Sequence, residues 1–231
     1  MPKLIDLTPV MATALGVPQP TVGIVARHAR GAGLITSKGR GPGGAEMSAT
    51  DGANLLIGVM STRVGIPSQD VGDAISLVRS LVLRPSSFDV YLHSRDAGKV
   101  RGPLAGLISQ LAWKGTFGEA LDRLLSWQDQ DHSAWKEFMV SIPVTEGQRH
   151  FRVSISQGTS ISANISFRIS EAFAIQFVYE ASEGVNAPPH TRDTAGYGDL
   201  QTRASIGPNT ITSLMNFLQS PLQPPTPADR P

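Results

Sequence analysis

Cysteine is missing from the 231-residue chain, and neither sign of charge is in clear excess. The lack of cysteine excludes disulfide bonds, thiolate metal ligands and cysteine nucleophiles. Because the net charge is only +1, any affinity for nucleic acid must come from a local basic patch. No apolar run is long enough to cross a bilayer, and residues 1–7 lack the apolar core of a signal peptide. We therefore expect a cytoplasmic protein without a membrane partner.

Hydrophobic residues make up 40% of the chain, which is enough for one large domain or two small ones. Apolar spacing of three and four residues predicts helices over residues 49–63, 70–83, 102–115 and 116–131. Two of these helices begin with capping boxes, Ser48 with Asp51 and Thr116 with Glu119. In the first of them, the apolar side is predicted to contain Ala53, Leu56, Ile57 and Met60.

A period of two residues replaces the helical period after Phe138. Alternating segments over residues 137–147, 149–156, 160–170 and 172–182 predict an antiparallel meander whose apolar face receives the middle helices. Residues 88–94 could add a short strand. Residues 186–209 have neither period and are interpreted as a long loop, followed by a short helix at 210–218 and a proline-rich, unpacked tail.

The stretch ATALGVPQPTVGIVARHARGAGL, residues 12–34, carries the most specific pattern. Thr8 before Pro9 is predicted to begin a helix, which a turn at Gly16 joins to a second helix. Ala12, Gly16 and Val22 have the spacing that a close crossing of two helices requires. Apolar residues at Leu15, Val17 and Val25 support the same register. Pro18 has no side-chain oxygen to cap the second helix, so either Gln19 or Thr21 must help or the helix begins late.

This spacing resembles the helix-turn-helix of bacterial and phage transcription regulators. The resemblance implies that the second helix enters the major groove of DNA. Six residues would then face the groove: Gln19, Pro20, Thr21, Gly23, Ile24 and Arg27. His28 and Arg30 would lie nearer the phosphate backbone. Glutamine suits adenine, arginine suits guanine, and isoleucine or threonine can contact a thymine methyl group.

The basic residues near this stretch favour a surface that faces phosphate groups. No acidic residue occurs between Asp6 and Glu46, as a backbone-binding surface requires. Residues 33–48 are predicted to form strand, glycine-rich loop and strand, which is the wing of a winged helix. Its tip would place Lys38 and Arg40 against the backbone or in a minor groove. The first quarter of the chain is also similar to DNA-binding segments of phage-type and gene-transfer-agent activators of alphaproteobacteria.

Catalytic and metal-binding patterns are not found in the sequence. The five histidines are scattered and have no partner at metal-ligand spacing. No Gly-x-Ser-x-Gly elbow is present, and the loop GRGPGG lacks the Lys-Ser/Thr of a nucleotide-binding loop. We therefore predict no enzyme activity, no cofactor and no metal. The tryptophans are interpreted as core or interface residues rather than as a platform for single-stranded nucleic acid.

The sequence thus predicts an α+β protein with three parts. Residues 1–66 would form a winged helix-turn-helix domain, residues 67–183 a helical segment packed on the meander for dimerisation or effector contacts, and residues 184–231 a loop, a short helix and a tail. The expected function is sequence-specific regulation of transcription at the nucleoid. Such a protein would work as a homodimer on double-stranded DNA, in contact with RNA polymerase or another transcription factor. A phage-type DNA-packaging or replication-initiation protein and a structural scaffold protein are the alternatives.

Overall fold

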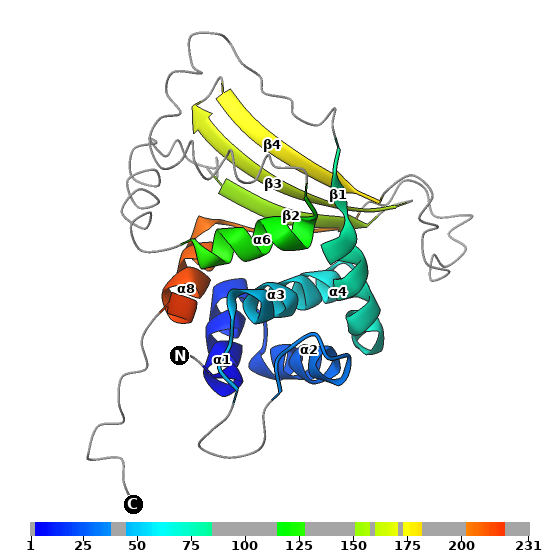
Figure 1. The fold of residues 1–231 in the computed structure, drawn as a ribbon, viewed down its shortest axis with the longest axis vertical. Coiled ribbons are helices and arrows are strands. Elements are labelled where there is room, and N and C mark those ends of the chain that lie inside the picture. Colours follow the sequence, from blue (N-terminus) through cyan, green and yellow to red (C-terminus); the bar gives the residue numbers. More distant parts are fainter. Residues whose placement is uncertain are drawn as a thin grey trace, which may run out of the picture.

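The computed structural model describes residues 3–37, 45–84, 115–127, 151–157, 160–170, 173–181 and 202–219. These residues form six α-helices and one open antiparallel sheet of five strands, which confirms the α+β class. The sheet lies at one side of the molecule, α3, α4 and α6 lie next to it, and α1 and α2 lie at the far side (Figure 1).

The first two helices are α1 (Leu4–Leu15) and α2 (Gln19–Gly31). The prediction that α1 begins at Thr8 is wrong, because Pro9 lies inside the helix. Asp6 accepts a hydrogen bond from the backbone N–H of Lys3, at 3.4 Å, and supplies a negative charge to the first turn. Both effects stabilise a helix start upstream of the proline. The Thr8 hydroxyl donates to the carbonyl oxygen of Leu4 at 2.9 Å instead of capping the helix.

Helix α3 (Ala49–Arg63) forms the centre of the molecule and contacts α2, α4, α6, α8, β2 and β5. Its predicted capping box is present: Asp51 N–H donates to the Ser48 hydroxyl, at 3.1 Å, and Ser48 N–H donates to the Asp51 carboxylate, at 2.8 Å. Every residue from 51 to 61 is buried. The four predicted apolar residues are therefore in the core, but the helix has no solvent side along these three turns.

A 3₁₀ turn (Ser68–Asp70) leads into α4 (Val71–Ser80), and the short strand β1 (Val82–Leu83) follows. Helix α6 (Phe117–Ser126) begins at the predicted capping box of Thr116 and Glu119. Phe117 packs edge-on against Tyr179 of the sheet, with ring centroids 5.4 Å apart. This contact confirms that the second of the two middle helices covers the apolar face of the sheet.

The other strands are β2 (Phe151–Gln157), β3 (Ile161–Ser170), β4 (Phe173–Glu180) and β5 (Thr202–Ile206), and the sheet order is β1-β4-β3-β2-β5. β2, β3 and β4 confirm the predicted meander. β5 lies within the segment that was predicted to be a loop, so that prediction is wrong for these five residues. Only Ala204 and Ile206 of this strand point into the core, which is too short an alternation to be recognised as a strand.

Helix α8 (Pro208–Gln219) confirms the short helix predicted near the end of the chain. It packs against α1 and α6, and the hydroxyl of Thr210 donates to the carbonyl oxygen of Ala14 at 2.9 Å. The buried core is continuous from Leu7 to Met215. The division into domains at residues 66 and 183 stays a prediction.

Several predicted elements lie outside the described residues. These are the possible strand at 88–94, the helix at 102–115 apart from its last residue, the strand at 137–147 and the tail at 220–231. In the part of the chain that the structure does describe, no helix has the length and apolar character needed to cross a membrane.

Candidate nucleic-acid interface

Helix α2 has one buried side and one exposed side. Val22, Val25, Ala26 and Ala29 form the buried side. Val25 packs directly over Gly58 of α3, because a Cβ atom placed on that glycine would lie 2.8 Å from Val25 Cγ1. This close contact fixes the rotation of α2 about its own axis, and therefore also fixes which of its residues face outward.

The exposed side of α2 contains half of the ten residues that the sequence assigned to DNA. Gln19, Pro20, Ile24, Arg27 and Arg30 are exposed, whereas Thr21, Gly23 and His28 are half-buried. Pro20, Ile24 and Arg27 follow one another at four- and three-residue spacing and so share one face of the helix. The structure thus brings eight of the ten predicted residues onto one helix. The other two, Lys38 and Arg40, lie outside the described residues.

The turn between α1 and α2 has the expected backbone geometry. Gly16 adopts the left-handed conformation, with φ 62° and ψ 39°, and the N–H of Val17 donates to the carbonyl oxygen of Ala12 at 3.1 Å. Pro18 occupies the N-cap position of α2, and no side chain caps this helix. Its carbonyl oxygen accepts from the N–H of Thr21 at 3.0 Å, so α2 begins at Gln19 with backbone hydrogen bonds alone.

Charge is distributed unevenly around α2. The helix contains Arg27, His28 and Arg30 and no acidic residue. Its C-terminal end packs against the start of α4, where a Cβ atom on Gly72 would lie 2.8 Å from Cβ of Ala32. Asp73, the residue after Gly72 in the first turn of α4, is exposed. A phosphate backbone is therefore favoured along the exposed side of α2 and disfavoured beyond its C-terminal end.

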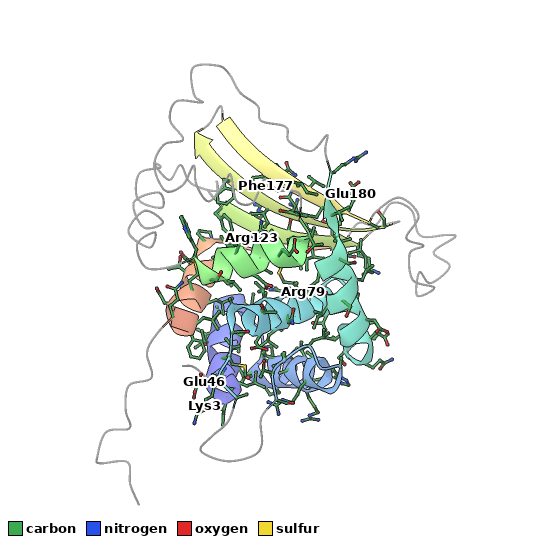
Figure 2. The ribbon with its side chains drawn as sticks, in the orientation of Figure 1. Lys3, Glu46, Arg79, Arg123, Phe177 and Glu180 are labelled. Carbon is green, nitrogen blue, oxygen red and sulfur yellow. The ribbon has the colours of Figure 1, made fainter. Side chains whose placement is uncertain are left out.

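The predicted wing is not confirmed. Residues 34–37 do not form a strand, and Glu46 makes an isolated antiparallel bridge with Lys3 rather than with these residues. Lys3 and Glu46 lie together at one end of α1 (Figure 2). The carboxylate of Asp51 explains the difference, because it accepts hydrogen bonds from the backbone N–H of Thr36, at 2.7 Å, and from the Thr36 hydroxyl, at 3.2 Å.

Asp51 therefore holds both ends of the segment that carries Lys38 and Arg40. The same carboxylate accepts from the N–H and the hydroxyl of Ser48, at 2.8 and 2.7 Å. The sequence indicated the capping box, but nothing in it indicated the contact with Thr36, which lies 15 residues earlier. A buried carboxylate with four donors makes both ends of this segment a fixed part of the surface beside α2.

The described residues contain no group of three or more histidine, aspartate or glutamate side chains placed to hold a metal ion. Trp127 is buried, as the interpretation of the tryptophans as core or interface residues requires, and Phe151, Phe167 and Phe177 are buried as well. Trp113 and Trp135 lie outside the described residues. No family model, no curated protein and no solved structure matches this chain.

Proposed function

We propose that this protein binds double-stranded DNA in a sequence-specific way and regulates transcription, with α1 and α2 acting as a helix-turn-helix. The observation that carries the proposal is that α2 has a buried side and an exposed side. Val22 and Val25 are buried in the core, whereas Ile24 and Arg27 are exposed to solvent. A helix held in this way presents a constant set of side chains to the major groove.

The chemistry of the exposed side suits a base-reading surface. The guanidinium group of Arg27 can donate two hydrogen bonds to O6 and N7 of a guanine, and the amide of Gln19 can pair with an adenine. Arg30 and His28, at the C-terminal end of the helix, suit phosphate groups. Lys38 and Arg40 are proposed as further phosphate contacts.

A single module of this size covers little DNA, so we propose a homodimer that binds two half-sites. In a two-fold dimer the half-sites would lie about 34–36 Å apart or a multiple of that distance. In its finer form the proposal is an activator of phage-derived or gene-transfer-agent genes, which acts together with RNA polymerase or another transcription factor.

The test is fluorescence anisotropy with the full chain and duplexes selected from a random library, measured at several salt concentrations. We expect Arg27→Ala to weaken the selected duplex about 5- to 150-fold, the equivalent of one bidentate base contact of 1–3 kcal/mol, and to affect random DNA much less. Arg30→Ala should weaken both kinds of DNA and lower the salt slope by about 0.9. Arg203→Ala, at an exposed position of β5, is the matched control and should change neither.

In cells, chromatin immunoprecipitation with sequencing should give a few sharp peaks for the wild-type protein and none for a chain with Arg27→Ala and Arg40→Ala. Equal losses for the selected and random duplexes in Arg27→Ala, together with the absence of peaks for the wild-type protein, would contradict the proposal.

A further inference from the structure

Ile24 is an apolar side chain at an exposed position of α2, where a polar side chain would be expected. It is 42% exposed, and among the described residues only Ile5 and Val82 are other large hydrophobic side chains with comparable exposure. Ile24 lies in the middle of α2, one helical turn after Pro20 and just under one turn before Arg27. Its exposure brings nothing to the stability of the isolated protein, because burial in the core would be more favourable.

The core of the molecule holds Ile24 at the surface. Val22 and Val25, which lie two residues before and one residue after Ile24, are 0% and 1% exposed, and Val25 packs against Gly58 of α3. A rotation of α2 that buried Ile24 would bring these two valines out of the core. Since isoleucine is β-branched and has one preferred side-chain conformation in a helix, Ile24 presents its methyl groups in a fixed direction.

The surface beside Ile24 is open. Gly23 has no side chain, and no heavy atom lies within 4 Å of the place where its Cβ atom would be. Thr21 is half-buried, so it reaches out less than Ile24 does. A base edge can therefore approach the backbone of α2 closely at Gly23 and meet the side chain of Ile24.

From this arrangement we infer that Ile24 is a specificity-determining residue that contacts the C5-methyl group of a thymine in the major groove. The inference rests on the proposed function. Thymine is the base that presents a methyl group in the major groove, and an exposed aliphatic side chain suits that group better than it suits the hydrogen-bonding edges of the other bases.

The position of Arg27 on α2 predicts how far the thymine lies from a guanine in the binding site. Residues three apart on a helix are separated by about 4.5 Å along its axis, whereas successive base pairs are about 3.4 Å apart. The thymine that contacts Ile24 and the guanine that contacts Arg27 are therefore expected within one or two base pairs of each other.

The test replaces thymine by deoxyuridine, which removes only the methyl group. Duplexes are first selected from a random library with the full wild-type chain, and each thymine of the best duplex is then replaced in turn. We expect one position per half-site where the replacement weakens binding roughly fourfold, which is the equivalent of about 0.8 kcal/mol for one buried methyl group. The other replacements should have little effect.

Two variants assign that effect to its residue. Ile24→Ala should bind the thymine and the deoxyuridine duplex equally, whereas Ile24→Val, which keeps a branched side chain, should still distinguish them. Thermal unfolding checks that both variants fold, and because Ile24 is 42% exposed we expect only small changes in melting temperature. Arg27→Ala should bind more weakly but keep the preference for thymine.

The outcomes separate this inference from the proposed function. Selected duplexes that bind tightly but show no deoxyuridine effect overturn the role of Ile24 and leave the function in place. A deoxyuridine effect that persists in Ile24→Ala also overturns it, because another residue then reads the methyl group. If no duplex is enriched by the wild-type chain, the proposed function fails and this inference fails with it.

Discussion

The ion pair between Arg79 of α4 and Asp122 of α6 should stabilise the fold far more than an ordinary surface ion pair. Arg79 Nη2 lies 2.7 Å from Asp122 Oδ2, and Nη1 donates to Asp122 Oδ1 at 3.1 Å and to Asn54 Oδ1 at 2.8 Å. The Arg79 and Asp122 side chains are only 21% and 25% exposed. Figure 2 labels Arg79, which lies between α3, α4 and α6.

The neighbouring residues leave Arg79 little freedom. Asp122 also accepts from the hydroxyl of Thr50 at 3.1 Å, and a Cβ atom on Gly118 would lie 2.9 Å from Arg79 Cζ. The amide nitrogen of Asn54 in turn donates to the carbonyl oxygen of Leu34, directly after α2. One guanidinium group thus connects α4 and α6 to the helix that positions α2.

The magnitude follows from burial. Loss of one partner of a buried pair costs about 3–5 kcal/mol, whereas an exposed pair contributes about 0–1 kcal/mol. At this intermediate burial, and with bidentate geometry, we expect Arg79→Met to lower the free energy of unfolding by about 2 kcal/mol. The coupling energy between Arg79 and Asp122 should be about 1–2 kcal/mol.

The assay is urea unfolding of the wild type, Arg79→Met, Asp122→Ala and the double variant, analysed as a double-mutant cycle with a common m value. The matched control is the cycle for Arg84 and Glu180, an ion pair of 3.2 Å whose side chains are 57% and 39% exposed. Its coupling energy should be below about 0.5 kcal/mol. Similar coupling energies for the two pairs would refute the argument from burial and geometry.

Two further predictions concern single residues. Gly16→Ala should destabilise the protein by about 1 kcal/mol, because its φ of 62° is strained for any residue with a Cβ atom. Gly23 has open space around it and no positive φ, so Gly23→Ala should raise the free energy of unfolding by up to about 1 kcal/mol. Losses of equal size for the two variants in urea unfolding would contradict this. The hydroxyl of Tyr179 is buried without a hydrogen-bond partner among the described residues, and burial raises its pKa well above the usual value of 10, although the charge of Arg123 opposes the shift. Tyr179→Phe should therefore equal the wild type or exceed it by about 1 kcal/mol at pH 8. Above about pH 10 the unfolded tyrosine loses its proton while the folded one keeps it, so wild-type stability should fall and that of Tyr179→Phe should fall less; parallel declines between pH 8 and 10.5 would argue against this ionisation.

The helices and strands with clear periods could be predicted, but the position of α3 in the molecule could not. Polar residues of an amphipathic helix usually face solvent, yet Asp51, Asn54 and Ser61 of α3 are all buried. Asp51 and Asn54 find their partners in residues 34 and 36, in Ser48 and in Arg79. A single sequence does not show such partners, because they depend on contacts between distant segments.

The incorrect predictions for the start of α1 and for β5 have different causes. Thr8 and Pro9 form a good start signal for a helix, but Asp6 and Lys3 begin the helix earlier. The helix then runs through Pro9, which cannot donate the backbone hydrogen bond that another residue would give at this position. β5 was missed because tertiary pairing with β2, rather than its own pattern, makes it a strand.

The candidate site divides in the same way. The spacing of Ala12, Gly16 and Val22 was enough to predict the exposed side of α2 in part, because this register depends on short-range helix geometry. Five of the eight predicted residues of α2 are exposed and three are half-buried. The expected wing, in contrast, depended on pairing between two strands. Hydrogen bonds from Thr36 to Asp51 and the bridge from Glu46 to Lys3 replace that pairing in the described residues.

The central place of α3 has a consequence for synthesis on the ribosome. α3 ends at Arg63, but α8, which supplies part of its surroundings, begins at Pro208. At typical translation rates of about 5–20 residues per second, the nascent chain therefore spends roughly 7–30 s with the apolar residues of α3 incompletely covered. During that interval α4, α6 and β2 are made and can already pack against α3, but its contacts with α8 form only after residue 208 has been added.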